Sequence, residues 1–202
     1  MASAVLNLAA WLERSDANGP GRRFVIWVQG CPLACPKCFS PETHDPGPRR
    51  LVDIEYLAER ALAIHGIEGL TYTGGEPMEQ ARGLALLSER LRPAGLSVVC
   101  YTGYTLETLR ARRDPWVDRL LASVDLLIDG PYVHERAANL PWRGSDNQRL
   151  ITLTDRYRAL TAMATDAETG PRVAFSVSAD GFTATGIWPH GFMDRLHERL
   201  RR

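Results

Sequence analysis

The stretch "RRFVIWVQGCPLACPKC" (22–38) joins an apolar run to a loop that holds three of the four cysteines in the chain. The run over 22–30 is rich in β-branched and aromatic residues and ends in glycine, so it predicts a buried strand that leads straight into the loop. Cys31, Cys35 and Cys38 follow at the spacing C-x3-C-x2-C. In a reducing compartment, thiols at this spacing are more typical of metal ligands or reactive groups than of disulfides.

Further apolar runs and helical patterns alternate along the chain after this loop. Three more strands are predicted at "IEGLTYTGGEP" (67–77), "GLSVVCYTG" (95–103) and "SVDLLIDGPY" (123–132). Helical spacing of apolar residues predicts helices that begin after Asp53, after Pro77 and at 105. This alternation predicts a parallel sheet with crossover helices, and "NQRLITL" (147–153) is a candidate for one more strand.

The predicted strands end in the segments "QGC", "TGGEP", "YTGY" and "DGPY". Because the carboxyl ends of parallel strands meet at one edge of a sheet, we expect these four segments to lie close together. Ligands bind at this edge in parallel α/β proteins. The sequence therefore predicts one site, built around the cysteine loop.

The pattern changes after Asp155. Alternating residues and an Asp-Gly pair predict an antiparallel hairpin over 172–189, and 191–202 is typical of a short terminal helix. No linker divides the chain clearly, so we expect 1–154 to form the core and 155–202 to form a C-terminal extension. We expect the extension to pack away from the predicted site, which would leave the site open to a protein loop. If the extension covers the site instead, only a small substrate can enter.

Length and charge exclude some classes of function. The 202 residues suffice for one domain with a sizeable core, and 24 Lys and Arg balance 24 Asp and Glu. A net charge of zero gives no long-range attraction to nucleic acid or to an anionic membrane. No targeting segment or membrane-spanning run is apparent, so we predict a cytoplasmic protein with no nucleic-acid or membrane partner.

Three interpretations of the cysteine loop remain open from spacing alone. A [4Fe–4S] cluster held by three thiolates would leave its fourth iron free for a ligand. A structural zinc site normally needs four ligands, and His44 could complete a Cys3His set. Cys35 and Cys38 could instead form a redox C-x2-C pair. The fourth cysteine, Cys100, lies in a predicted strand and is expected to be buried and inert.

The C-x3-C-x2-C loop followed by "GGEP" (74–77) resembles the radical S-adenosylmethionine (radical SAM) superfamily. The finer resemblance is to the activating enzymes of glycyl radical proteins, above all the activases of anaerobic ribonucleotide reductases. It is carried by blocks that occur in the order of the family and together cover roughly 6–153: "DANGPGRRFVIWVQGCPLACPKCFSPETHDP", "TYTGGEPMEQ", "YTGYTLETL", "DGPY" and "WRGSDNQRLI".

This resemblance implies a cofactor and a chemistry. Cys31, Cys35 and Cys38 would hold a [4Fe–4S] cluster, whose open iron would bind the amino and carboxylate groups of S-adenosylmethionine. One electron, from a donor such as flavodoxin or ferredoxin, would cleave the cofactor to methionine and a 5′-deoxyadenosyl radical. That radical would take a hydrogen atom from the substrate.

The residues of the "GGEP" segment suit such a cofactor on physical grounds. Gly74 and Gly75 have no side chain, so a ligand can approach the backbone closely. Glu76 can accept a hydrogen bond from an amino group, and Pro77 suits the first turn of a helix. A plain strand-to-helix turn is the alternative interpretation of this segment.

Other cofactor contacts follow only from the resemblance. Phe39 would pack near the adenine, and Thr102 and Gly103 would contact the methionine moiety. Asp129 would reach the ribose or the methionine end, although an Asp-Gly-Pro turn would equally explain it. In the "WRGSDNQ" block, a basic residue could pair with the cofactor carboxylate, or the block could be a structured loop. The positions concerned there are Arg143, Ser145 and Asn147.

The predicted fold is α/β, an incomplete parallel (β/α) barrel of the radical SAM type with a C-terminal β-hairpin and helix. The predicted function is hydrogen abstraction that installs a glycyl radical on a partner enzyme. One alternative is the same chemistry on a peptide or small molecule that this enzyme converts itself. An alternative of another class is a non-catalytic zinc or iron–sulfur interaction module.

Overall fold

The computed structural model describes residues 4–163, 173–178, 181–189, 191–192, 195 and 198–199. Its main feature is a seven-stranded mixed sheet with the strand order β3-β1-β2-β4-β5-β6-β9. The strands are β1 Val5–Ser15, β2 Arg23–Val28, β3 Leu51–Asp53, β4 Gly69–Gly74, β5 Ser97–Thr102, β6 Leu126–Asp129 and β9 Arg149–Thr152. The α/β class and the large, mostly parallel centre of the sheet are confirmed.

The four central strands β2, β4, β5 and β6 are parallel, as the alternating pattern predicts. The helices between them are α1 Ile54–Leu62, α2 Ala81–Leu91, α3 Leu106–Ala111 and α4 Pro115–Leu121. Asp53 caps α1 by accepting a hydrogen bond from the backbone N–H of Glu55. The predicted helix after Pro77 begins as a 3-10 turn, η2 Pro77–Gln80, before it continues as α2.

The outer strands of the sheet run antiparallel to their neighbours. The segment 147–153 does form a strand, β9, but it runs antiparallel to β6. At the other side, β1 pairs antiparallel with both β2 and β3. The sequence analysis did not predict β1, although the alternation of buried Leu6 and Leu8 with less buried neighbours indicates a strand there.

One face of the sheet packs against the helices and forms the main core. Side chains such as Leu6, Ile26, Tyr72 and Leu87 are fully buried there. The opposite face lies around Val99 and Ile128, with buried Tyr157 packed against it near the amino ends of the strands. Toward the carboxyl ends, this second face leads to the candidate site.

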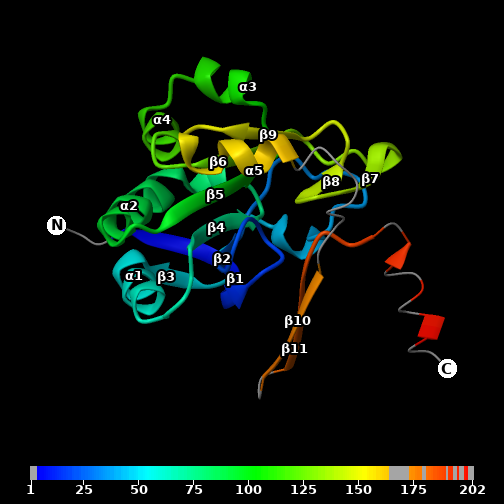
Figure 1. The fold of residues 1–202 in the computed structure, drawn as a ribbon, viewed down its shortest axis with the longest axis horizontal. Helices are drawn as coiled ribbons and strands as arrows, with labels where there is room; N and C mark the ends of the chain where they lie inside the picture. Colours follow the sequence, from blue (N-terminus) through cyan, green and yellow to red (C-terminus); the bar gives the residue numbers. More distant parts are fainter. Residues whose placement is uncertain are drawn as a thin grey trace.

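Smaller elements complete the described structure (Figure 1). They are the 3-10 turns η1 Pro41–Thr43, η3 Arg92–Ala94, η4 His134–Arg136 and η5 Asp155–Tyr157, the helix α5 Arg158–Met163, and the strands β7 Ala137–Leu140 and β8 Arg143–Ser145. No helix among the described residues is long and apolar enough to cross a membrane.

The C-terminal extension contains the predicted hairpin. Strands β10 Val173–Ser178 and β11 Gly181–Gly186 pair antiparallel, while Asp180 of the predicted turn lies outside the described residues. In Figure 1 the hairpin points away from the seven-stranded sheet. Most of the predicted terminal helix over 191–202 also lies outside the described residues.

Candidate functional site

The cysteine loop is held on both sides by backbone contacts. At the end of β2, the backbone N–H of Gly30 donates to the carbonyl of Thr43 at 2.8 Å. The next N–H, that of Cys31, donates to the carbonyl of His44 at 3.1 Å. Within the loop, Ala34 and Lys37 adopt positive φ angles of 44° and 54°, which tighten the chain between the cysteines.

All three cysteines are half-buried and line one pocket. Burial raises the pKa of the Cys31 and Cys38 thiols, while hydrogen bonds from backbone N–H groups lower it. One of these donors is the N–H of Ser40, whose nitrogen lies 3.4 Å from Cys38 Sγ. A bound metal would favour the thiolate forms, and hydrogen bonds to cluster sulfurs are usual in iron–sulfur sites. The loop thus fits a [4Fe–4S] cluster.

The alternative of a single metal ion finds less support in this loop. Among the described residues, no three His, Cys, Asp or Glu side chains are arranged to hold one ion together. His44 lines the same pocket, and its Nε2 is buried without a hydrogen-bond partner in the structure. A cluster with several irons does not require the thiols to converge on one point, because each can bind a different corner.

The two glycines of "GGEP" bring the end of β4 against the start of the cysteine loop. Gly74 has a φ of +98°, and a Cβ there would lie 2.7 Å from the Trp27 Cα. A Cβ on Gly75 would lie 2.2 Å from the carbonyl oxygen of Gly30. The backbone N–H groups of Gly75 and Glu76 donate to the carbonyls of Val28 and Gly30 at 2.8 and 2.9 Å. Only glycine allows this approach.

Glu76 is buried, with 1% of its surface exposed, and belongs to the pocket lining. Its Oε1 accepts hydrogen bonds from Thr102 Oγ1 at 2.8 Å and from the Met78 N–H at 3.0 Å. Its Oε2 accepts from the Gly103 N–H at 2.8 Å. Burial raises the pKa of Glu76 to about 7, so a cationic group in the pocket would favour its charged form.

Thr102 and Gly103 also line the pocket, and both donate hydrogen bonds to Glu76; their contact with a methionine moiety stays a prediction. A Cβ on Gly103 would lie 2.2 Å from Leu33 Cδ1, so this glycine also lets the cysteine loop approach β5. Phe39 lines the pocket and packs edge-on against Tyr132, with ring centroids 4.9 Å apart. The sequence analysis did not single out Tyr132, although it stands in the quoted "DGPY" block.

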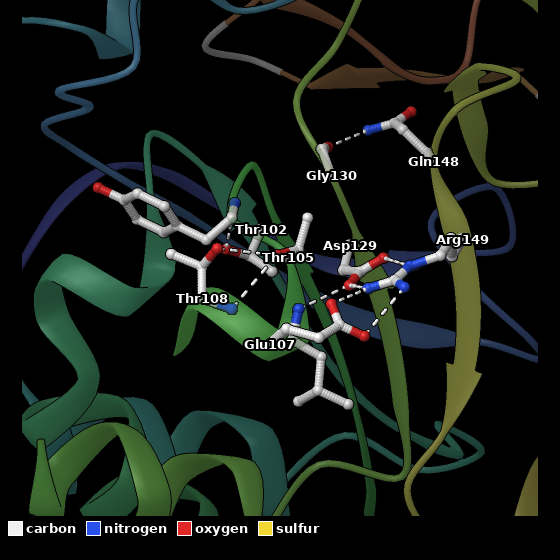
Figure 2. A network of polar contacts seen from close by, with 10 residues as sticks. Thr102, Thr105, Glu107, Thr108, Asp129, Gly130, Gln148 and Arg149 are labelled. Atoms are coloured by element: carbon white, nitrogen blue, oxygen red, sulfur yellow. Dashed lines mark hydrogen bonds and ion pairs between the residues drawn. The ribbon is translucent and has the colours of Figure 1, made fainter. Parts of the chain in front are cut away.

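Five candidate contact residues from the sequence analysis do not line the pocket: Pro77, Asp129, Arg143, Ser145 and Asn147. The Asp129 carboxylate is buried and accepts hydrogen bonds from the Leu106 N–H and from Arg149 Nε, both at 2.8 Å. Figure 2 shows Arg149 between Asp129 and Glu107, which it contacts at 2.7 Å. The side chain of Asp129 thus links β6 to α3 and β9.

Gln148 connects two parts of the pocket wall and was missed in the sequence analysis. Its Nε2 donates to the Gly130 carbonyl at 3.1 Å (Figure 2), and its Oε1 accepts from the Gly144 N–H at 2.8 Å. In the same block, Ser145 Oγ accepts from the Val133 N–H at 3.2 Å. The block "WRGSDNQ" therefore contains a hydrogen-bonded loop. The position of Gln148 within this block was the signal in the sequence that could have identified it.

The pocket is open and has a volume of ≈ 370 Å³, within the range of about 300–1,000 Å³ that is usual for small-molecule sites. Its wall includes a stretch of the extension, 184–188. Thr185 Oγ1 donates to Asn18 Oδ1 at 3.0 Å and fixes this stretch to the core. We expected the extension to pack away from the site; instead it contributes one side of the pocket, because Thr185 finds a buried acceptor there.

Comparison with known proteins agrees with this geometry. Residues 17–151 match the family described as 4Fe-4S single cluster domain. The anaerobic ribonucleoside-triphosphate reductase-activating protein of Enterobacteria phage T4 is 34% identical over 145 residues, which is 68% of this chain and 88% of the relative. The protein of the same name from Vibrio cholerae is 34% identical over 146 residues, 68% of this chain and 92% of the relative.

A protein from Haemophilus influenzae, named putative glycyl-radical enzyme activating enzyme, is 40% identical over 93 residues, which cover 43% of this chain and 34% of the relative. The family match ends at residue 151, so the extension lies beyond it. The matched region contains the cysteine loop, the two glycines, Glu76 and Gln148. This chain belongs to the family of anaerobic ribonucleoside-triphosphate reductase-activating proteins.

Proposed function

We propose that this chain is a radical SAM activase that installs a glycyl radical on an anaerobic ribonucleotide reductase in the cytoplasm. One observation carries the proposal: the three cysteine thiols and the buried Glu76 line the same pocket at the carboxyl ends of the parallel strands. The names of the relatives supply the class of partner.

With the cluster and S-adenosylmethionine bound, one electron from a flavodoxin or ferredoxin would cleave the sulfonium C–S bond, giving methionine and a 5′-deoxyadenosyl radical that takes a glycine Cα hydrogen and leaves as 5′-deoxyadenosine. Cys31, Cys35 and Cys38 would hold the [4Fe–4S] cluster, which would supply the electron for this cleavage. Because the pocket is open in the chain alone, the docked partner would complete the exclusion of water from the reacting atoms.

Glu76 is the residue that best fits the amino group of the cofactor. Each of its carboxylate oxygens can accept more than one hydrogen bond, so the contacts to Thr102, Met78 and Gly103 leave acceptor capacity. Those three donors also fix the orientation of the carboxylate before the ligand arrives. Thr102 and Gly103 then act on the methionine end by positioning Glu76 as well as by lining the pocket.

The edge-on aromatic pair of Phe39 and Tyr132 offers an apolar surface for the adenine. The contact between Asp129 and the cofactor stays a prediction. Its carboxylate already binds Arg149 and the Leu106 N–H, so its effect on the pocket would come through the neighbouring backbone of Gly130.

The extension forms only one side of the pocket, which stays open, and this openness supports a large substrate. We propose that the four parallel strands form the wall of an incomplete (β/α) barrel, whose open side admits a loop of the partner protein. Residues 1–154 would act as the radical SAM core, with 155–202 as an extension. The open pocket, lined by both, supports this arrangement.

The test is anaerobic reconstitution followed by turnover. We expect about four irons and four sulfides per chain, reductive cleavage of S-adenosylmethionine to 5′-deoxyadenosine, and a glycyl radical signal by electron paramagnetic resonance on an anaerobic ribonucleotide reductase of the source genome. Tightly bound zinc in place of iron would contradict the whole proposal. Cofactor cleavage with no radical on the reductase would contradict the partner and favour a peptide or small-molecule substrate.

A further inference from the structure

The hairpin of the extension forms a sheet of its own. Strands β10 and β11 pair with each other and, among the described residues, with no strand of the main sheet. A lone two-stranded hairpin is marginally stable in water and gains stability from a third strand. The family match covers residues 17–151, so the hairpin lies beyond the matched region.

The end of β11 is fixed at the pocket. Thr185 is buried and donates to Asn18 Oδ1, which also accepts from Ser15 Oγ at 2.7 Å. On the other side of the hairpin, Phe175 packs with Trp188, their centroids 6.4 Å apart, and Trp188 stacks on Phe192 at 5.6 Å. These contacts hold the strand in a definite position while its last residues line the site.

Within the described part of the chain, no strand pairs with the outer edge of β11. Ser178 and Gly181 form the last pair of the hairpin and are three positions apart, the spacing at which two strands close on a hydrogen-bonded pair. Hydrogen-bonded and non-hydrogen-bonded pairs alternate along the hairpin from there. The Phe175–Ala184 pair is therefore a non-hydrogen-bonded one, whose backbone N–H and C=O groups point away from the partner strand. Among the described residues, no backbone hydrogen bond outside the hairpin involves β11.

We propose that an extended, glycine-containing segment of the partner protein pairs with the outer edge of β11 and is led along it into the pocket. The inference rests on the proposed function and names how that substrate is held. Backbone pairing suits a glycine substrate, because the target residue itself offers no side chain for recognition. It also explains why Ala184 and Gly186, which are small, lie where the strand meets the site.

The edge can be tested by removing one backbone N–H. Ala184→Pro deletes an outward donor of β11, whereas Ala184→Ser keeps the N–H and nearly the same volume. We expect the KM for the reductase to be about tenfold higher in the proline variant than in the serine variant. A tenfold change is the effect expected from losing one backbone hydrogen bond between β11 and the partner segment. Equal KM values in the two variants would overturn the proposal.

Wild-type protein gives a second measurement that does not depend on the folding of a variant. Hydrogen exchange resolved by residue, with the purified anaerobic ribonucleotide reductase as the probe, should slow at the outward amides of Phe182, Ala184 and Gly186. If the wild type installs the glycyl radical and these amides exchange unchanged, this inference alone fails. If the wild type installs no radical on the reductase, the proposed function fails and this inference with it.

Discussion

Two buried charged side chains mark the opposite ends of the same parallel strands. Arg23, fully buried, stands where β2 begins, and Glu76 stands just after β4 ends. The guanidinium of Arg23 donates to Ser97 Oγ at 2.7 Å, to Tyr157 OH at 3.0 Å and to the carbonyl of Leu70. Protein acceptors surround it, so this end of the sheet is closed.

Glu76 accepts three hydrogen bonds, fewer than Arg23 donates, and it lines the pocket. Burial lowers the pKa of Arg23 and raises that of Glu76 to about 7, so both charges are costly. At the closed end, hydrogen bonds from the chain itself offset the cost. At the open end, the remaining capacity of the carboxylate is left for a ligand. The comparison separates a buried charge that stabilises the fold from one that serves the site.

The largest effect is expected at the open end. Cys38→Ala should remove the cluster and with it essentially all cleavage of S-adenosylmethionine, because two thiolates cannot retain it. Cys100→Ala is the control, since Cys100 is fully buried in β5 among core side chains. Iron and sulfide analysis after anaerobic reconstitution measures both. Equal iron loss in the two variants would mean that the site is not confined to the loop.

The next effect belongs to the closed end. Arg23→Met should lower the free energy of unfolding by on the order of 3 kcal/mol, because it leaves buried carbonyls and hydroxyls without a donor. The neighbouring Arg22→Met removes an exposed ion pair with Asp16 and should change it by less than about 1 kcal/mol. Urea denaturation of the apoprotein compares the two. Similar losses would mean that Arg23 does not hold the strand ends together.

The two ends also differ in how far the sequence predicts them. The cysteine loop, the two glycines and Glu76 are predictable because local spacing and backbone demands select those residue types. The four parallel strands follow from the alternating pattern. Arg23 is adjacent to Arg22 and looks like it in the sequence, and only the tertiary position of Ser97 and Tyr157 reveals its role. The same holds for Asp129, whose partner Arg149 comes from β9.

A smaller effect is expected in how the free energy of unfolding depends on pH, and it arises at the open end. With a pKa of about 7 when folded against an ordinary 4.5, Glu76 keeps its proton in the folded apoprotein over a range where the unfolded chain has lost it. Its contribution to the free energy of unfolding is therefore intact below pH 4.5 and is lost progressively as the pH rises to about 7.

Glu76→Gln should remove this decline, so the stability of the wild type relative to the variant should fall between those two pH values. Glu55→Gln, an exposed residue of α1, is the control and should leave the decline in place. Urea denaturation of the apoproteins at several pH values gives the comparison. Parallel profiles for the wild type and Glu76→Gln would show that the pocket hydrates this carboxylate as well as bulk water does.

The smallest effect concerns the joint between the extension and the open end. Thr185→Val removes the hydrogen bond to Asn18 Oδ1 but keeps the shape, and Ser15 still satisfies that oxygen. Because no buried group loses its last partner, the cost should be only about 1 kcal/mol and confined to the hairpin. The free energy of global unfolding measured in urea should then change little. The backbone amides of the hairpin should exchange their hydrogens about fivefold faster. Thr161→Val removes hydroxyl contacts to the carbonyls of Tyr157 and Arg158 and should leave those amides unchanged. If Thr185→Val instead lowers global stability by several kcal/mol, the extension unfolds together with the core, and the pocket wall that it supplies is as permanent as the end closed by Arg23.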